Sequence, residues 1–269
     1  MTPRPITPVD AAPGRPEGPA VRVTIVTLDR HLAGAAARAE AALRAEIPGL
    51  TLTLHAASVW GEDAEALERC RADIASADVV IATMLFMEDH IEAVMPALMA
   101  RRERCDAMAA VLCGGEASKA TRLGRLDMAA DQRGVMALLK RLRGGSKASS
   151  TAPKAAPKPG GGAGQMAMLR RLPKILRYIP GAAQDLRAFF LTMQYWLAGS
   201  EENLANLVRF LIDRYAAGPR AALRGALAPE PPREYPEVGL YHPELPGKTA
   251  ERLEALAPLS AGAPAGRPR

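Results

Sequence analysis

Side chains that can do chemistry gather directly after apolar runs in this 269-residue sequence. Carboxylates and imidazoles follow the first and third runs, and two glycines with a carboxylate follow the fourth. The set comprises Asp29, His31, Glu88, Asp89, His90, Gly114, Gly115 and Glu116. Groups of these types bind a divalent metal or move a proton when a fold brings them together. They form the candidate site of the sequence.

Ordinary structural roles also suit several polar residues. Glu88 and Asp89 stand where a helix is expected to begin, and acidic residues are favourable there because of the helix dipole. In that case His90 points to solvent. His55 ends an alternating stretch and is expected on the surface or at a sheet edge. Cys113, before the two glycines, is either a thiol nucleophile or a buried cysteine at a strand end.

The elements that must position the candidate site follow from periodicity. Strands are predicted at 21–28, 50–55, 78–86 and 107–113, and helices at 32–46, 63–75 and 88–104. Strands and helices in alternation indicate parallel βαβ units. The carboxyl ends of such strands share one edge, where ligands bind in open α/β sheets. We therefore expect an α/β fold with a Rossmann-like or flavodoxin-like parallel sheet of about four to five strands, and the candidate residues in one crevice at its edge.

The second half of the sequence predicts a helical C-terminal extension. Helices are expected at 121–143, at 166–178 and, with a break at Gly199–Ser200, through 185–216. Residues 144–164 contain only Gly, Ala, Ser, Thr, Pro and Lys, which predicts a flexible linker. Residues 1–20, with six prolines, are expected to form a disordered tail, and one short strand is expected in 236–243.

Two features of this half have both a packing and a binding interpretation. The basic helix 166–178 either lies on a membrane surface or in an acidic groove, or packs with Met168, Leu169, Leu172, Ile175 and Leu176 inward. The aromatic residues Phe189, Phe190, Tyr195 and Trp196 either line a pocket for a flat apolar ligand or belong to the core. At helical spacing, core packing is the commoner role.

Composition excludes several classes of protein. Three cysteines without a C-x-x-C pair argue against a disulfide scaffold and a cysteine-based zinc site. The longest apolar stretch, 188–198, is shorter than the roughly 20 residues of a membrane-spanning helix, and the proline-rich start is no signal peptide. The common nucleotide-binding and hydrolase motifs are absent. We expect a cytoplasmic protein without a transmembrane segment.

Charge is unevenly distributed along the chain. The net charge is +6, and residues 101–178 contain 17 Lys and Arg against 5 Asp and Glu. A basic middle suits nucleic acid, an anionic membrane or an acidic partner, but it also suits a solvated linker between helices. No nucleic-acid partner is expected, because the basic residues cluster around the predicted linker.

Four strings of the sequence carry a family resemblance. They are VTIVTLDRHLAG from Val23, LERCRADIASADVVIATMLFMEDH from Leu67, the segment 164–215, and YPEVGLYHP at 235–243. In this order they resemble the large, porphyrin-binding subunit of magnesium chelatase in its bacteriochlorophyll-pathway form. The resemblance implies one N-terminal domain over 21–245, with 246–269 as an irregular tail outside the family. A cobaltochelatase large-subunit fragment is the nearest alternative.

The resemblance implies a part in the ATP-dependent insertion of Mg²⁺ into protoporphyrin IX, on the way to chlorophylls. In that family the porphyrin is held by the large subunit, and two ATPase-related partner subunits bind the ATP. Because the family's large subunit is much longer, this chain is expected to be truncated and inactive alone. No catalytic residue of the family maps onto this sequence. A non-catalytic module that docks porphyrin or partner subunits is a further alternative.

Overall fold

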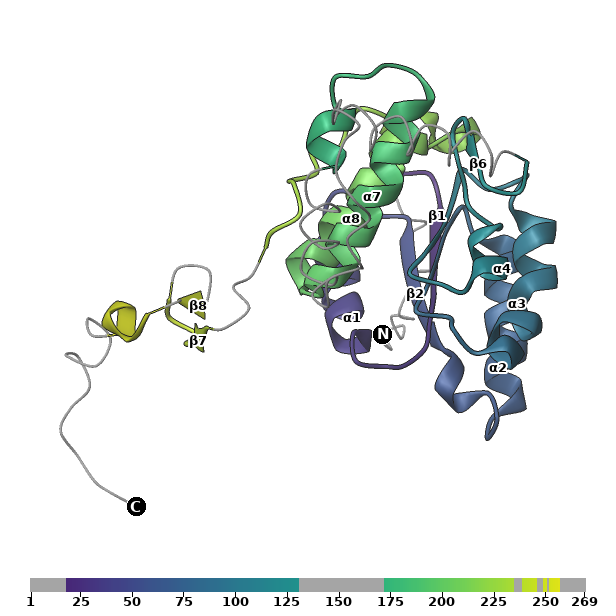
Figure 1. Cartoon of the computed structure of the whole chain (residues 1–269), viewed down its shortest axis with the longest axis horizontal. Coiled ribbons are helices and arrows are strands. Elements are labelled where there is room, and N and C mark those ends of the chain that lie inside the picture. Colours follow the sequence, from purple (N-terminus) through teal and green to yellow (C-terminus); the bar gives the residue numbers. More distant parts are fainter. Residues whose placement is uncertain (1–17, 131–171, 235–238, 246–248, 251, 257–269) are drawn as a thin grey trace, which may run out of the picture.

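The computed structural model describes residues 18–130, 172–234, 239–245, 249–250 and 252–256, and in this part six strands form one sheet (Figure 1). Four of them are parallel: β1 (Val21–Thr27), β2 (Leu50–Ala56), β3 (Val79–Thr83) and β4 (Ala107–Val111). With the short strands β5 (Arg122–Leu123) and β6 (Leu126–Asp127) they give the order β2-β1-β3-β4-β5-β6. The predicted α/β class with a parallel sheet is confirmed.

Helices connect the parallel strands, as predicted. α1 (Ala33–Leu43), α2 (Ala64–Ser76) and α3 (Glu88–Arg101) follow β1, β2 and β3 in turn. A short helix that was not predicted, α4 (Gly115–Ser118), follows β4. Asp63 begins α2, because its carboxylate accepts the Ala66 N–H at 2.9 Å. The chain crosses outward from β1 to β2 and then back to β3 and β4. Right-handed crossovers therefore place α1 on one face and α2 and α3 on the other.

Each face of the sheet carries its own hydrophobic core. In β1, Val23 and Ile25 belong to the cluster under α1, whereas Val26 belongs to the cluster under α2 and α3. In β3, Ile81 belongs to the first cluster and Val80 to the second. Side chains alternate along a strand, so a strand buried on both faces must be apolar throughout. This explains the continuous apolar runs in the sequence.

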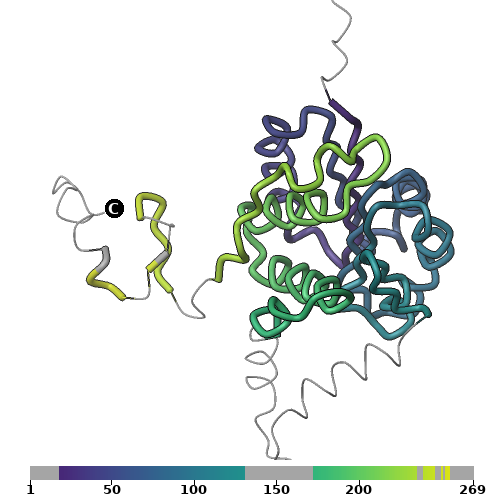
Figure 2. Tube along the Cα trace, turned by 90° about the horizontal axis from the view of Figure 1, so that it is seen from above, coloured from purple at the N-terminus to yellow at the C-terminus, as the bar shows by residue number. Residues whose placement is uncertain are grey.

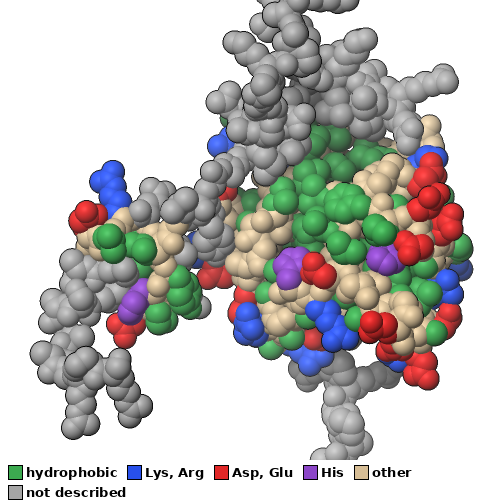
Figure 3. Space-filling view, turned by 60° about the horizontal axis from the view of Figure 1, so that its bottom comes forward, with side chains coloured by type: hydrophobic (Ala, Val, Ile, Leu, Met, Phe, Trp, Pro, Cys, Tyr) green, Lys and Arg blue, Asp and Glu red, His purple; other side chains and the backbone are tan. Residues whose placement is uncertain are grey.

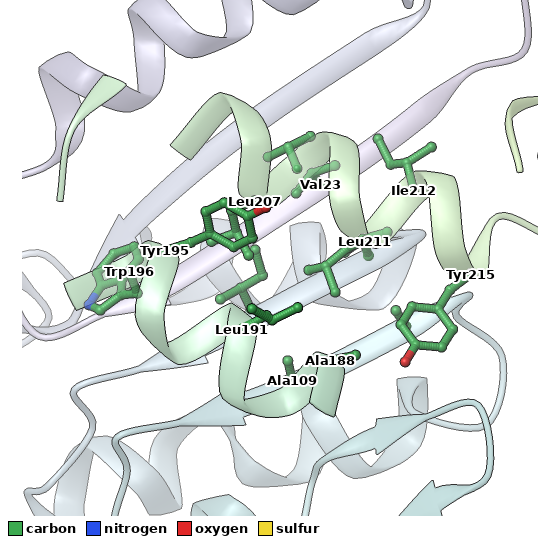
Figure 4. Close-up of a cluster of buried hydrophobic side chains, with 14 of the residues drawn as sticks. Val23, Ala109, Ala188, Leu191, Tyr195, Trp196, Leu207, Leu211, Ile212 and Tyr215 are labelled. Carbon is green, nitrogen blue, oxygen red and sulfur yellow. The ribbon is translucent and has the colours of Figure 1, made fainter. Parts of the chain in front are cut away.

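The predicted helical extension completes one of these faces. α7 (Ala182–Ala198) packs against β4 and α8, and α8 (Glu201–Tyr215) packs against α1. α1 lies over β1 and β2. The other strands on the same face of the sheet therefore need further helices to bury their side chains. Figure 4 shows side chains of both helices, including Leu191 and Leu211, between the helices and the strands that carry Val23 and Ala109. Figure 2 shows these helices alongside the N-terminal part of the sheet domain.

The junction of α7 and α8 lies where the sequence predicted a break. Gly199 ends α7 with a φ of 58°, a conformation that L side chains rarely adopt. Ser200 caps α8 by accepting the Asn203 N–H at 3.1 Å. Arg38 of α1 forms an ion pair with Glu201 in the first turn of α8, at 2.6 Å.

The prediction of a helix over 121–143 is wrong where the structure describes this segment. β5 (Arg122–Leu123) and β6 (Leu126–Asp127) form an antiparallel hairpin at the sheet edge. Gly124, with a φ of 55°, makes the turn, and a Cβ there would lie 2.8 Å from the Asp185 carboxylate. Residues 131–143 lie outside the described residues, as do 1–17 of the predicted tail and all of the predicted linker 144–164.

Arg220, in the 3₁₀ helix Gly218–Leu223, joins the segment after α8 to the sheet. Its Nε donates to Asp106 at 2.8 Å, and its Nη1 lies 3.2 Å from Asp78. Both aspartate side chains are largely buried and directly precede the strands β4 and β3. A single guanidinium therefore joins the amino ends of two strands to the segment after α8.

The ambiguous features of the second half take packing roles in the described residues. Phe190, Tyr195 and Trp196 are buried in the core. Of the basic segment, residues 172–176 are helical, and Leu172 and Leu176 are buried. Ile175 is 52% exposed, so its predicted inward orientation is wrong.

The described residues beyond 239 contain two short strands. β7 (Leu240–Tyr241) confirms the strand predicted in 236–243 and pairs antiparallel with β8 (Thr249–Ala250). A 3₁₀ turn, Leu253–Leu256, follows. None of the described helices is long and apolar enough to cross a membrane.

Candidate functional site

Loops that follow the four parallel strands meet at the carboxyl edge of the sheet. These loops are residues 28–32, 57–63, 84–87 and 112–114. The C-terminal end of α7 joins them, because the rings of Trp196 and His31 lie edge to face with centroids 6.3 Å apart. The strand order thus brings together segments far apart in the sequence, and every residue of the predicted site belongs to this edge or to the helix starts beside it.

Asp29 and His31 contact each other through their side chains in the loop after β1. Asp29 also accepts the His31 backbone N–H at 2.9 Å. The backbone hydrogen bond and, next to it, the side-chain hydrogen bond from His31 hold the pKa of Asp29 below its ordinary value. An ionised carboxylate therefore orients an imidazole at the sheet edge, an arrangement that can accept a proton.

Glu88, Asp89 and His90 form the first turn of α3. Asp89 accepts the His90 backbone N–H at 2.9 Å, so this carboxylate helps to satisfy the helix start. The His90 ring packs edge-on against Trp60 with centroids 5.8 Å apart. The expectation that His90 points to solvent is therefore wrong, because the loop after β2 brings an aromatic ring against it.

Gly114, Gly115 and Glu116 begin α4 beside the loop after β3. The Gly114 N–H donates to the Leu85 carbonyl at 2.8 Å, which joins the two loops. A Cβ on Gly114 would approach Ile91 Cδ1 to 2.9 Å, so the backbone passes close to α3 here. Glu116 binds Lys119 at 2.7 Å on the surface of its own turn.

The candidate residues thus share an edge without forming one cluster. Asp29 contacts His31, His90 contacts Trp60, and Glu116 contacts Lys119. Within the described residues, no three His, Cys, Asp or Glu side chains form a group that could hold a metal ion. The chemistry available at this edge is hydrogen bonding and proton exchange by separate pairs.

Unsatisfied polar atoms mark the same edge, and sequence reasoning missed most of them. Across the described ranges, the buried side-chain atoms without a hydrogen-bond partner are Thr27 Oγ1, Trp60 Nε1, Thr83 Oγ1 and His90 Nδ1. Thr27 and Thr83 end the neighbouring strands β1 and β3. A buried unsatisfied polar group costs about 1–3 kcal/mol. All four of these atoms lie on the carboxyl edge, so this edge has hydrogen-bonding groups that a ligand or another surface could pair.

Backbone strain lies at this edge too. Met84 directly follows β3 and Leu112 directly follows β4, with φ angles of 58° and 54°. In the part of the chain that the structure describes, these are the non-glycine residues with positive φ. Such conformations cost about 1–3 kcal/mol and are enriched at functional sites.

An exposed apolar surface adjoins the strained loops. Phe86 and Met87 are 56% and 54% exposed, although both directly precede α3. Contiguous exposed apolar surface is a common feature of interaction sites, so these two side chains are candidates for contact with another surface. Figure 3 shows a face on which apolar side chains gather in a broad area, with histidine and carboxylate side chains along its margin.

A cavity of about 350 Å³ opens beside this edge at the end of β2. Arg30, His55, Trp60 and Arg69 contribute to its lining. His55 lies in the edge strand β2, as predicted, and its Nε2 lies 2.8 Å from the Asp73 carboxylate. The volume is at the small end of the range for small-molecule sites.

Cys113 has the environment of a structural cysteine. Its Sγ lies 3.3 Å from the Val111 carbonyl oxygen. Burial raises the pKa of the thiol to about 11, so it is protonated at neutral pH. The structure therefore favours the strand-end role over that of a nucleophile.

Two family models match the chain. Residues 22–190 match the family described as "Domain of unknown function (DUF3479)", and residues 193–266 match the family "CobN/Magnesium Chelatase". The first match contains the whole carboxyl edge apart from the end of α7. The two matches meet inside α7, so the boundary between the families falls within a helix that covers the sheet.

Similar proteins are magnesium-chelatase subunits. The chain is 49% identical to such a subunit of Cereibacter sphaeroides over 91% of its own length. It is 44% identical to the corresponding protein of Rhodobacter capsulatus over 88%, and 30% identical to the chloroplastic protein ChlH of Oryza sativa subsp. japonica over 68%. The chain spans 19% of the length of each of the two bacterial relatives.

Proposed function

Because this chain belongs to the DUF3479 family and is similar to the N-terminal part of a magnesium-chelatase subunit, we propose that it serves as the N-terminal domain of a porphyrin-binding chelatase subunit. The proposed enzyme inserts Mg²⁺ into protoporphyrin IX for bacteriochlorophyll synthesis. The observation that carries the proposal is the 49% identity along 91% of the chain. The relatives named as magnesium-chelatase subunits favour magnesium over cobalt as the metal substrate.

The proposal includes the organisation of the enzyme. The domain extends over 21–245, with a linker at 144–164. Its partners are two ATPase-related subunits, which bind and hydrolyse ATP, and the reaction takes place in the cytoplasm. The ATPases supply the work of distorting a rigid macrocycle, while the porphyrin-binding subunit keeps it in place.

The geometry supports a holding role for this domain in the reaction. Metal insertion needs acceptors for two pyrrole protons and walls that exclude water around the ring. The carboxyl edge offers the Asp29–His31 pair as an acceptor, but Phe86 and Met87 leave it an open, apolar surface. Most of each bacterial relative lies outside the matched region. We propose that the remainder of the longer protein packs on this edge and completes the enclosure.

A chimera tests the proposed function. Residues 21–245 replace the matching region of the Cereibacter sphaeroides relative, and the chimera is combined with the partner subunits of that enzyme, ATP, Mg²⁺ and protoporphyrin IX. We expect Mg-protoporphyrin to form, as measured by its fluorescence. A control chimera that carries an unrelated flavodoxin-like domain should be inactive. A folded chimera that carries this chain and forms no product would contradict the proposal.

A further inference from the structure

A second cavity, of about 600 Å³, lies at the other end of α7 from the carboxyl edge. It is formed by the β5–β6 turn, the start of α7, the end of α8 and the segment after the 3₁₀ helix. The lining includes Arg125, Asp185, Phe210, Arg214, Tyr215 and Arg224. This volume is typical of sites for small organic ligands.

The floor of the cavity is a satisfied network around Asp185. This buried carboxylate accepts the Arg125 backbone N–H at 2.9 Å, the Tyr215 hydroxyl at 2.9 Å and Arg214 Nη2 at 3.2 Å. Its negative charge is therefore balanced by Arg214 within the protein. The other carboxylate of the lining, Asp213, accepts the Leu227 N–H at 2.9 Å.

The rim of the cavity carries two arginine charges that no described carboxylate pairs. Arg125 and Arg224 are exposed, and neither guanidinium has a side-chain or carbonyl partner among the described residues. Burial, together with the charges of Arg214 and Arg177, lowers the pKa of the nearby Arg187. Unpaired arginines beside further arginines favour a bound anion, and a planar guanidinium pairs best with carboxylate or phosphate.

The start of α7 adds to this field. The helix has 17 residues, and its N-cap, Gly181, has no side chain to bond the free amides of the first turn. Such a terminus carries a partial positive charge. The cavity wall also contains the ring of Phe210, whose centroid lies 5.9 Å from that of Tyr195. The site therefore combines anion-binding groups with an aromatic wall.

We infer that this cavity binds the carboxylate-bearing edge of a flat organic anion and, resting on the proposed function, that this anion is protoporphyrin IX. Its two propionate groups pair with Arg125 and Arg224, and the adjoining part of the macrocycle lies against Phe210. The cavity is open, so it holds one edge of the ring and leaves the pyrrole nitrogens outside. Binding by this domain alone is accordingly weak, and metal insertion does not take place in this cavity.

The experiment titrates protoporphyrin IX into the 269-residue chain and follows the quenching of tryptophan fluorescence. The test variant is Arg125→Gln/Arg224→Gln. The matched control is Arg22→Gln/Arg104→Gln, which removes two exposed charges outside the cavity lining. We expect the dissociation constant to rise about tenfold in the test variant, because charge-assisted pairs are lost. The control should bind as the unmodified chain does, and all three proteins should melt at similar temperatures.

A second ligand distinguishes binding through the two carboxylates from binding through ring contacts with Phe210. Protoporphyrin IX dimethyl ester keeps the ring and loses both charges, so it should bind about as weakly to the unmodified chain as the acid binds to the test variant. Equal affinity of the acid for the unmodified chain and the test variant, equal affinity for acid and ester, or no binding of the acid would each overturn the inference. None of these results would contradict the proposed function, because the chimera can form product with the porphyrin held by its other parts.

Discussion

At the scale of single residues, the carboxyl edge stores unfavourable free energy. Thr27 and Thr83 bury hydroxyls without partners, and Met84 and Leu112 hold a left-handed backbone. These features lie at the ends of neighbouring strands. They would be offset if a ligand or another part of a longer protein supplied hydrogen bonds there, which agrees with an edge that such a protein completes.

Thr83→Val should stabilise the isolated chain. Valine has nearly the same shape, and the change removes a buried hydroxyl without a partner, so we expect the free energy of unfolding to rise by about 1 kcal/mol in urea titrations. Thr192→Val is the matched control. Thr192 is equally buried, but its hydroxyl donates to the Ala188 carbonyl at 3.0 Å, so its replacement should bring no gain. A loss of stability at Thr83 similar to that at Thr192 would show that Thr83 has a partner.

The sequence predicted which residues follow the strands at the candidate site, but not the contacts that their side chains make. Asp29, Glu88 and Gly114 could be placed at one edge because they follow strands, and this needs only the order of elements. The contacts of His90 with Trp60 and of His31 with Trp196 depend on how loops pack across the sheet, which local patterns do not encode. A threonine as the last residue of an apolar strand was the available signal for Thr27 and Thr83.

At the scale of elements, hydrophobic periodicity predicted the long strands and helices, and it failed for the two-residue strands. The four parallel strands are apolar or alternating runs of at least five residues, and each was predicted. The predicted strands 78–86 and 107–113 were too long, because β3 ends at Thr83 and β4 at Val111, where Met84 and Leu112 take a positive φ. β5 and β6 contain two residues each, too few to show a period, and the helix formers around them suggested a helix instead. Gly124, between two leucine-containing pairs, was the local signal of a turn.

The β5–β6 hairpin depends on a buried arginine. Arg102 of the segment after α3 is 5% exposed, and its Nη2 donates to Asp127 Oδ1 at 2.6 Å. Burial alone raises the pKa of Asp127, but hydrogen bonds from Arg102 and from the Ala130 and Ala129 N–H groups outweigh it, and the pKa is lowered. The folded state therefore favours the ionised carboxylate.

Asp127→Asn should destabilise the chain in a pH-dependent way. Because the folded pKa lies below the ordinary value of 3.8, the carboxylate contributes stability above that pH and loses it as the pH falls through the folded pKa. Asp127 is partly exposed, so we expect a loss of about 1 kcal/mol at pH 7 that shrinks below about pH 4. Urea titrations across this range measure it. Glu62→Gln, which removes an exposed carboxylate with no described side-chain partner, should show neither effect; a loss independent of pH in Asp127→Asn would contradict the account.

At the scale of the whole molecule, one domain forms from two distant stretches of sequence. The first stretch supplies the sheet and covers one of its faces. The second, with α7 and α8, covers the remaining half of the other face. The sequence predicted these helices but treated them as an extension, because nothing local shows that a stripe of apolar residues packs on strands more than 70 residues earlier. The resulting domain leaves its carboxyl edge open, and this is the edge on which we propose that the remainder of a longer protein packs.

The most direct test of this account is a metallation assay of the isolated chain beside the chimera. Both are combined with the partner subunits, ATP, Mg²⁺ and protoporphyrin IX, and the formation of Mg-protoporphyrin is followed by fluorescence. We predict product from the chimera and none from the isolated chain above a control without it, because the open edge does not enclose a porphyrin. Product from the isolated chain would place the insertion centre within these 269 residues and contradict the account.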